Sequence, residues 1–352
     1  MSESAYARAG VDIDAGDRAV ELMMASVKKT HRSEVIGGLG GFAGLFDASA
    51  FKDFAHPVLA SSTDGVGTKV AIAQAMDIHN TIGWDLVGML IDDLVVCGAE
   101  PLFLTDYIAC GKVVPERIAS IVSGIADACA ANNTALLGGE TAEHPGLLSD
   151  DEYDIAGATV GVVEKDEILG AHLVKPDDIV VAIASSGLHS NGYSLVRKVL
   201  LSDASMRLDA QVADLGRTLG EELLEPTRVY AAQLLKVIKQ VDVHALSHIT
   251  GGGFAANLAR ILPAGTRAIL DRSTWTPAPI FQLVQRIGEI EQEDIETTLN
   301  MGVGMAVIVS EENTNSLLTA LDEVGLPRWV CGRVELAEGN KASAQCVGKH
   351  PW

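Results

Sequence analysis

The chain carries a glycine-rich turn directly after an apolar run, with Asp64-Gly65-Val66-Gly67-Thr68-Lys69 following Val58-Leu59-Ala60-Ser61-Ser62. The apolar run predicts a strand, and the turn places a carboxylate, a hydroxyl, backbone N–H groups and a mobile lysine cation side by side. These groups suit a polyphosphate with Mg²⁺. The turn does not match the Walker A pattern, so a nucleotide site here belongs to another architecture. A plain turn with Asp64 and Lys69 in solvent is the competing interpretation.

The composition indicates a globular protein of the cytoplasm with two domains. A chain of 352 residues with 48% hydrophobic content can bury two cores. We expect no membrane span and no signal peptide, because no apolar run is long enough and the N-terminus is acidic. Five widely spaced cysteines without a C-x-x-C pair indicate reduced thiols. The net charge of -21 argues against nucleic acid or an anionic membrane as partner.

Alternating helical and strand periodicities predict a layered α/β fold. Helices are expected at residues 14–30, 81–97, 115–132, 193–200, 228–239, 254–262 and 314–324. Strands are expected at residues 58–62, 102–109, 134–137, 155–163, 179–184, 243–249 and 305–309. The charged stretch at residues 164–167 suggests a boundary. The predicted domains are therefore residues 1–168 and 169–340, followed by a tail at residues 341–352.

Residues 36–46 form a second glycine-rich segment, with five glycines in eleven residues. The segment contains G-x-G-x-x-A, but no strand pattern leads into it and no helix pattern follows, so a Rossmann turn is not expected. One interpretation is a flap that closes over a ligand, with Phe42 and Phe46 as its apolar contacts. A plain mobile loop is the alternative.

Four acidic residues from separate segments point to one metal–nucleotide site. Asp92 and Asp93 interrupt a helix that is apolar nearly all round, and buried carboxylates are rare unless paired or bound to metal. The two side chains point about 100° apart on a helix, so at most one should face a given partner. Asp106 and Glu140 are expected just past strand ends, where α/β proteins collect ligand-binding groups. Together with Asp64 they predict a Mg²⁺–nucleotide site, with helix capping or an N–H or arginine partner as alternatives.

The second half of the chain offers two polar loops that contain glycines. The first follows a predicted strand and reads Ser185-Ser186-Gly187-Leu188-His189-Ser190-Asn191-Gly192-Tyr193-Ser194. The second is Thr250-Gly251-Gly252-Gly253, whose glycines permit close backbone approach. Both loops suit a phosphate or a ribose. His189 could instead be a surface histidine, and His144 has no metal ligands at zinc spacing around it.

Seven segments of the chain occur in a distinctive order: residues 64–69, 98–103, 138–143, 186–194, 224–228, 250–254 and 300–305. They include Gly138-Gly139-Glu140-Thr141-Ala142-Glu143 and Leu224-Glu225-Pro226-Thr227-Arg228. In this order they resemble the phosphoribosylformylglycinamidine cyclo-ligase family, also called aminoimidazole ribonucleotide synthetases. The resemblance spans about residues 35–334. The chain departs from the family pattern at Asp92, Leu188 and His144, where the family usually has Asn, Pro and Met.

The resemblance implies a purine-pathway enzyme of two α/β domains that works as a homodimer, with the N-terminal sheets of two subunits pairing into a barrel. In the implied reaction, ATP is split to ADP and phosphate while formylglycinamidine ribonucleotide closes to 5-aminoimidazole ribonucleotide. The formyl amide oxygen is phosphorylated on the way. ATP and Mg²⁺ are the implied cofactors, and a small ribonucleotide is the implied substrate.

The resemblance also implies roles for individual residues. The N-terminal domain is expected to bind ATP and Mg²⁺, with Asp64, Asp93 and Glu140 as metal ligands. Lys69 is expected to be an electrostatic stabiliser, His189 an acid or base, and Asp106 a further catalytic group. The expected ATP-binding residues are Gly40, Gly41, Phe42, Asp64, Gly65, Gly67, Thr68, Lys69, Asp93, Gly138, Gly139 and Glu140. The expected substrate-binding residues are Ser186, Gly187, His189, Ser190, Asn191, Thr250, Gly251 and Gly252.

Other functions fit the sequence less well. Thiamine-monophosphate kinase, selenophosphate synthetase and the amidotransferase that precedes this step are ATP-dependent members of the same superfamily. A selenophosphate synthetase would usually present a reactive cysteine or selenocysteine near its N-terminus, whereas the first cysteine here is Cys97. The amidotransferase is much longer and needs a glutaminase nucleophile. A non-catalytic nucleotide-binding or assembly protein would have less need for Lys69 and four acids.

Overall fold

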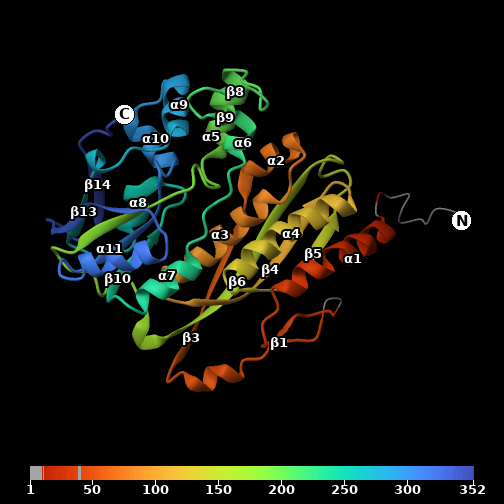
Figure 1. Ribbon diagram of the computed structural model, residues 1–352, viewed down its shortest axis with the longest axis horizontal. Helices are drawn as coiled ribbons and strands as arrows, with labels where there is room; N and C mark the ends of the chain where they lie inside the picture. The colour runs from red at the N-terminus through yellow and green to blue at the C-terminus, as the bar shows by residue number, and fades with distance from the viewer. Residues whose placement is uncertain (1–9, 11, 39–40) are drawn as a thin grey trace, which may run out of the picture. The chain divides into compact units, whose positions relative to one another are not determined.

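The computed structural model describes residues 10, 12–38 and 41–352, and the chain divides into two compact units (Figure 1). Unit 1 comprises Met1–Leu94 and Glu100–Lys165, and unit 2 comprises Val95–Ala99 and Asp166–Trp352. The main division falls within the charged stretch at residues 164–167, where the sequence suggested a boundary.

Unit 1 is built on a four-stranded mixed sheet with the strand order β3-β6-β4-β5. Its strands are β3 (Pro57–Gly65), β4 (Glu100–Cys110), β5 (Ala135–Glu143) and β6 (Tyr153–Glu164). β6 pairs antiparallel with β3 and with β4, and β4 pairs parallel with β5. A separate hairpin joins β1 (Val35–Ile36) to β2 (Leu45–Phe46).

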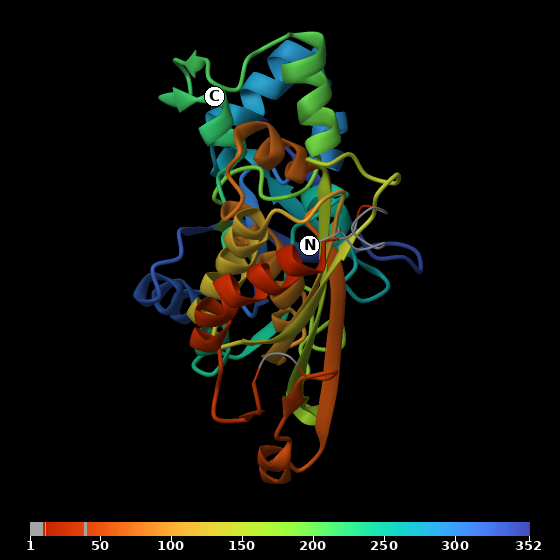
Figure 2. The same ribbon diagram turned by 90° about the vertical axis from the view of Figure 1, so that its right-hand side faces the viewer.

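The helices of unit 1 are α1 (Ile13–Lys29), α2 (Val70–Met76), α3 (Thr81–Val95) and α4 (Pro115–Ala131), with short 3₁₀ turns at Ser49–Asp53 and Gly67–Lys69. Figure 2 shows α1 and α4 on one side of the four-stranded sheet. α3 is apolar nearly all round, and Leu86, Leu90 and Leu94 are each at most 1% exposed. Each such leucine contributes about 1.5–3 kcal/mol by burial. This helix is therefore a main component of the core of unit 1.

Unit 2 contains a six-stranded mixed sheet with the strand order β10-β12-β7-β13-β11-β14. The strands are β7 (Ile179–Ala184), β10 (Val243–His248), β11 (Thr266–Asp271), β12 (Val303–Val309), β13 (Arg328–Leu336) and β14 (Ser343–Val347). Neighbouring strands are antiparallel except for β11 and β14, which run parallel. Every residue of β12 is buried, as expected of a central strand that is covered on both faces.

Unit 2 also contains a small β8 (Gln211–Val212) and β9 (Arg217–Thr218) ribbon. Its helices are α5 (Tyr193–Val196), which continues as a π-helical turn at Arg197–Asp203, α6 (Leu219–Leu223), α7 (Ala231–Ile238), α8 (Gly253–Ala259), α9 (Pro279–Gly288), α10 (Gln292–Thr298) and α11 (Thr314–Glu323). Short 3₁₀ turns occur at Lys165–Glu167 and Arg272–Thr274.

The structure confirms the predicted α/β layering and places each predicted helix and strand on an observed one, with shifted ends. The expectation that acids stand past strand ends is wrong. β3 runs on through Asp64, and Asp106 and Glu140 lie inside β4 and β5. The reason is that neighbouring strands supply ladder hydrogen bonds to these polar and glycine residues, which have weak strand propensity by themselves.

The interpretation of residues 341–352 as a tail is also wrong. Ser343–Val347 forms β14, which pairs with β11 from Arg267↔Ser343 to Asp271↔Val347. The segment is too short, and too polar at alternate positions, for its pattern to identify it without its partner strand. The sequence analysis likewise missed α2, α6, α9, α10, β11 and β13.

Candidate functional site

The glycine-rich turn after β3 buries its lysine. Gly67–Lys69 forms a 3₁₀ turn that leads into α2. The Lys69 side chain is 0% exposed, and its Nζ lies 2.8 Å from Oδ1 of Asp85, which is also 0% exposed. The expectation of a mobile cation is therefore wrong. Asp85 was missed because it lies in the apolar helix α3, sixteen positions away from the lysine that it holds.

Asp64 and Asp106 lie in one row of the sheet. The register aligns Asp64 with Gly157 of β6, Gly157 with Asp106 of β4, and Asp106 with Gly139 of β5. Directly paired residues share a face, and a strand spacing of about 4.8 Å places the Cα atoms of Asp64 and Asp106 about 10 Å apart. Oδ1 of Asp64 accepts a hydrogen bond from the N–H of Gly65 at 2.7 Å. Two carboxylates from different strands therefore face the same side of the sheet.

Asp106 borders a cavity of about 630 Å³ within unit 1. This volume is within the range of small-molecule sites. Several predicted ATP-binding residues line the same cavity, together with apolar residues of α1 and α4: Gly41, Phe42, Gly138, Gly139, Glu140, Val20, Met23 and Val122. A Cβ on Gly139 would stand 1.9 Å from Oδ1 of Asp106, so only glycine leaves room for this carboxyl group. The structure brings these residues together, whereas Asp64, Lys69 and Asp93 do not line the cavity.

The environment of Asp106 changes its protonation. Burial raises the pKa of this carboxyl group to about 7, and a hydrogen bond from its own backbone N–H opposes that shift only in part. Near neutral pH the group therefore exists in both forms, and its protonated form can donate a hydrogen bond as well as accept one.

The two adjacent acids of α3 have different surroundings. Asp92 is 0% exposed, whereas Asp93 is exposed. Glu140 is exposed as well. Among residues 10, 12–38 and 41–352, no three His, Cys, Asp or Glu side chains form a group that could hold a metal ion. Mg²⁺ usually keeps several waters and takes one or two carboxylates plus substrate phosphates, so a site for this ion does not require three protein ligands.

The proposed flap is anchored at its base. Phe46 of β2 packs against Phe103 of β4, with ring centroids 5.4 Å apart, and the Arg32 guanidinium lies 5.9 Å from the Phe46 ring. Phe42 is fully exposed and borders the cavity. Phe46 is thus part of the attachment to the sheet. Gly40 lies outside the described residues, so its predicted contact stays a prediction.

In unit 2 a hydrogen bond joins the two predicted substrate loops. The N–H of Gly251 donates to Oδ1 of Asn191 at 3.1 Å. In the first loop, the N–H of Ser186 donates to Nε2 of His189 at 3.1 Å. His189 is 1% exposed and has a φ of 61°, so the alternative of a surface histidine is wrong. Because Nε2 is an acceptor here, that atom carries no proton in this arrangement.

Two motifs to which the sequence analysis gave no role hold the first loop. Oγ of Ser186 donates to the carbonyl oxygen of Pro226 at 2.6 Å and accepts from the N–H of Arg228 at 3.1 Å. Nδ2 of Asn300 donates to the carbonyl oxygen of Gly187 at 3.0 Å. Pro226, Arg228 and Asn300 all stand in the ordered motifs, and this was the signal that could have identified them. Their contacts could not be predicted, because they join segments far apart in sequence.

Comparisons with known proteins test the resemblance drawn from the sequence. The family models described as AIR synthase related protein, N-terminal domain and C-terminal domain match residues 47–163 and 175–344. The chain is 51% identical over 338 residues to a phosphoribosylformylglycinamidine cyclo-ligase of Brevibacillus brevis, covering 96% of this chain and 97% of the relative. A cyclo-ligase of a Geobacillus species is 49% identical over 335 residues, covering 95% and 96%. The chain belongs to the phosphoribosylformylglycinamidine cyclo-ligase family. The resemblance drawn from the sequence motifs is confirmed.

Solved structures share the fold of this cyclo-ligase family member at low identity. Thiamine-monophosphate kinase from Stenotrophomonas maltophilia K279a has a TM-score of 0.68 at 18% identity, covering 93% of this chain and 96% of that chain. E. coli HypE has a TM-score of 0.66 at 17% identity, covering 95% and 92%. The hydrogenase maturation protein HypE in complex with ATP has a TM-score of 0.65 at 16% identity, covering 94% and 90%. These likenesses show the two-domain α/β fold alone.

Proposed function

We propose that this chain closes formylglycinamidine ribonucleotide to 5-aminoimidazole ribonucleotide at the expense of ATP, with release of ADP and phosphate, as a step of purine biosynthesis. The observation that carries the proposal is 49–51% identity to cyclo-ligases over nearly the full length of both chains. Thiamine-monophosphate kinase and HypE share the fold at only 17–18% identity. The chain is accordingly an ATP-dependent ligase.

The reaction needs an activated oxygen. The formyl amide oxygen is a poor leaving group, and transfer of the terminal phosphoryl group of ATP to this oxygen converts it into phosphate. The amidine nitrogen that bears the ribosyl group then attacks the formyl carbon, so that a C–N bond forms and the C–O bond to phosphate breaks. Alignment of this nitrogen with the activated carbon supplies a large share of the acceleration.

Unit 1 provides the proposed nucleotide site. Its cavity has a suitable size, and glycine backbone and Phe42 line it, as base and phosphate binding require. A solved HypE structure of the same fold is a complex with ATP. Asp64, Asp93 and Glu140 would hold Mg²⁺, which when bound offsets the charge of the phosphates. We assign Lys69 to the charge on the transferred phosphoryl group, with Asp85 holding its ammonium in the ligand-free protein.

Unit 2 provides the proposed ribonucleotide site. Gly251 and Gly252 are exposed, so their backbone can approach a phosphate or ribose closely. The hydrogen bond between Asn191 and Gly251 fixes the distance between the two loops. Because His189 is buried and bonded to the N–H of Ser186, we assign it to positioning the loop in preference to proton transfer.

A homodimer is supported by the second face of the sheet in unit 1. In Figure 2 this face carries no helix within the described residues. Leu59 of β3 is 60% exposed and Tyr107 of β4 is 42% exposed. Pairing of this face with the same face of a second subunit would cover both side chains and form the proposed barrel.

The cysteines support a cytoplasmic location, because all five are free thiols. A search of the described residues finds no helix that could span a membrane.

Isotope transfer tests the proposed reaction. The purified protein would be given ATP and a ribonucleotide whose formyl oxygen carries a heavy isotope. One labelled oxygen should appear in inorganic phosphate for each ring closed. A kinase would leave the phosphoryl group on its product, and a binding protein would release no phosphate coupled to substrate. Label that stays in the organic product or reaches only water would contradict the proposal.

A further inference from the structure

One short helix, α10, supports both candidate ribonucleotide loops. A Cβ on Gly253 would stand 1.7 Å from the carbonyl oxygen of Glu296, and a Cβ on Gly192 would stand 2.4 Å from Cδ2 of Leu299. The backbone of each loop therefore touches the last turn of the helix, or the residue after it, with no room for a side chain. A displacement of α10 would move or release both loops.

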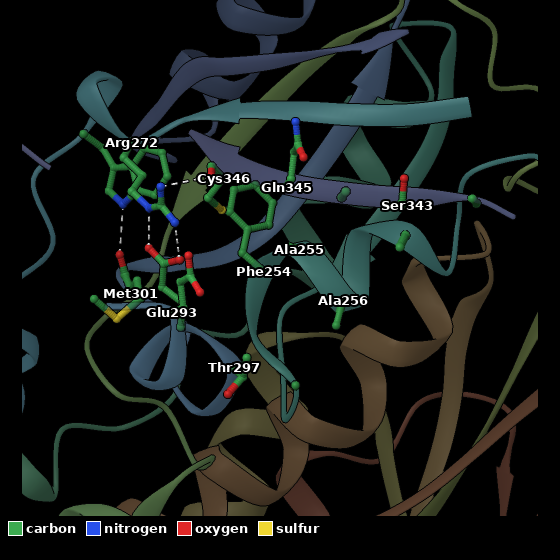
Figure 3. A pocket seen from close by; sticks show the side chains of 16 residues that line it. Phe254, Ala255, Ala256, Arg272, Glu293, Thr297, Met301, Ser343, Gln345 and Cys346 are labelled. Carbon is green, nitrogen blue, oxygen red and sulfur yellow. Dashed lines mark hydrogen bonds and ion pairs between the residues drawn. The ribbon is translucent and has the colours of Figure 1, made fainter. Parts of the chain in front are cut away.

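An ion pair fixes α10 to the sheet of unit 2. Nε and Nη2 of Arg272 donate to the two carboxylate oxygens of Glu296, at 2.6 and 2.7 Å (Figure 3). The same guanidinium donates to the carbonyl oxygen of Cys346 at 2.9 Å and to that of Gly348 at 3.2 Å. A bidentate arginine–carboxylate pair fixes direction as well as distance. Arg272 thus joins α10 to β14 and to the residues that follow β14.

The residues after β14 reach the same carboxylate. The side chain of His350 is buried, with Nε2 3.6 Å from Oε1 of Glu296. Its ring packs at 4.8 Å from the ring of Trp275, whose Nε1 donates to the carbonyl oxygen of Met301 at 2.9 Å. The segment that the sequence analysis assigned to a tail is therefore part of this cluster.

The charge of Glu296 is matched within the cluster. Burial acts to raise the pKa of this carboxyl group, but hydrogen bonds from Arg272 and Gln292, the nearby His350 ring and the positive charge of Arg272 outweigh burial and lower the pKa to about 2. The carboxylate therefore stays ionised near neutral pH and keeps its bidentate partner.

A cavity of about 510 Å³ lies beside the ion pair, and Gly252, Phe254, Trp275, Glu296 and residues of β14 line it (Figure 3). The loop at Gly252 lines this cavity, so on that side it borders open space and no side chains pack against it. The contact between Gly253 and α10 therefore acts together with the hydrogen bonds from Nδ2 of Asn257 to the carbonyl oxygens of Thr250, Gly251 and Gly253 in fixing this loop.

We propose that Arg272, Glu296 and His350 are positioning residues, which hold α10 and through it the loops at Gly192 and Gly253 in the arrangement that receives the ribonucleotide. This inference rests on the proposed assignment of those loops to the substrate. If the inference holds, residues 348–352 contribute to substrate affinity through their contacts with Arg272 and Glu296.

The test compares two charge-neutralising variants of the full chain. Glu296→Gln removes one partner of the ion pair with little change of shape. Glu335→Gln is the matched control, because Glu335 pairs with Arg267 at 3.1 Å, also in unit 2, but on the exposed surface of β13 and β11. Hydrogen exchange is measured without ligand at residues 186–194 and 250–254, and KM is measured for the ribonucleotide and for ATP.

In Glu296→Gln, exchange at both loops should rise about 10-fold and the ribonucleotide KM should rise about 10-fold, because small misplacements of binding groups have effects of this size. The KM for ATP should stay unchanged, and Glu335→Gln should match the parent protein in every measurement. Unchanged exchange at both loops in a folded Glu296→Gln protein would overturn the inference.

The outcomes separate this inference from the proposed function. Faster exchange with an unchanged ribonucleotide KM would uphold the mechanical link and overturn the assignment of the loops to substrate. If Glu296→Gln does not fold, His350→Ala serves, because it removes one contact to Glu296 and the packing on Trp275. Exchange at the loops should then rise by a smaller factor, and no rise would overturn the role of His350.

Discussion

The candidate sites of the two units differ in how far their functional groups are ordered before ligand binds. In unit 1, Phe42, Asp93 and Glu140 are exposed, and Phe42 and Glu140 line the cavity. In unit 2, His189 is 1% exposed and Ser190 is 8% exposed, and their loop is held by the Asn300 side chain and by the backbone of Pro226 and Arg228. The unit 1 site thus leaves two of its acids at the surface although its Lys69 is buried, whereas the first loop of the unit 2 site has its polar side chains built into the fold.

The difference matches what each half of the reaction demands. A nucleotide with Mg²⁺ brings its own charge and water, so exposed carboxylates and a loop can arrange around it. Ring closure needs the amidine nitrogen and the formyl carbon of one substrate to be held in line. The entropy cost of ordering the loops on binding is lower when the fold has already ordered them. The following changes test this comparison, from the largest expected effect to the smallest.

Lys69→Ala should slow turnover by about 10²–10³, the scale for losing one preorganised electrostatic group. It should also lower the free energy of unfolding by about 3–5 kcal/mol, because Asp85 is left as a buried charge without its lysine. Steady-state kinetics and denaturant unfolding measure the two effects. The double variant Lys69→Ala/Asp85→Asn should recover stability but not turnover, and a double variant with normal turnover would show that Lys69 has only a structural role.

Asp93→Asn should weaken Mg²⁺–ATP binding and turnover together by about 10–100-fold, the range seen when groups around a metal are altered. The fold should be unaffected because Asp93 is exposed. Calorimetry with Mg²⁺–ATP and kinetics check this. Asp127→Asn, which alters an exposed acid of α4, is the control. A folded Asp93→Asn protein with parental affinity and rate would remove Asp93 from the site.

The glycine-rich segment at residues 37–46 should exchange its amide hydrogens about 10-fold more slowly when nucleotide is bound. The reason is that a flap closed over a ligand undergoes the local opening motions required for exchange less often. Residues 186–194 should change little with nucleotide, since other motifs already hold that loop. Hydrogen exchange with and without a non-hydrolysable ATP analogue measures both. Equal exchange across residues 37–46 would make the segment an ordinary loop.

Asp106→Asn should change how stability depends on pH. In the parent, the folded state keeps the proton of Asp106 up to about pH 7, whereas the unfolded state releases it near the ordinary value of 3.8. The folded state then binds more protons, so this group makes the parent less stable as pH rises from about 4 to about 7. Thermal unfolding over this range should show a smaller decline for the variant. Parallel curves would contradict the high pKa.

The sequence predicted the layers, the central strands and the glycine-rich loops of both units, because apolar periodicity and glycine motifs are local features. It did not predict that Lys69 is buried, since Asp85 lies in another element. Nor did it show that Asp64 and Asp106 share a row, which depends on the register of each with β6. Pairing between distant segments is not encoded in any short window.

Long-range pairing also limited what the sequence could predict about the candidate loops of unit 2. The motif at residues 300–305 was recognised, but the hydrogen bond from Asn300 to Gly187 joins positions more than a hundred residues apart. Arg272 and Glu296 stood in no motif at all, and β14 was too short to identify. The predicted ligand-binding residues stood in recognisable motifs, whereas Arg272 and Glu296 did not.

The parallel pairing of β11 with β14 affects the order in which a newly made chain can fold. β11 is synthesised well before residues 343–347, and one edge of it stays unpaired until they emerge. Until then Arg272 also lacks the carbonyl oxygens of Cys346 and Gly348. On the ribosome, unit 2 therefore completes its sheet, and Arg272 gains these two contacts, only after residues 343–348 have emerged. A nascent chain stalled before that point would have an open strand edge, which favours association with other chains over folding.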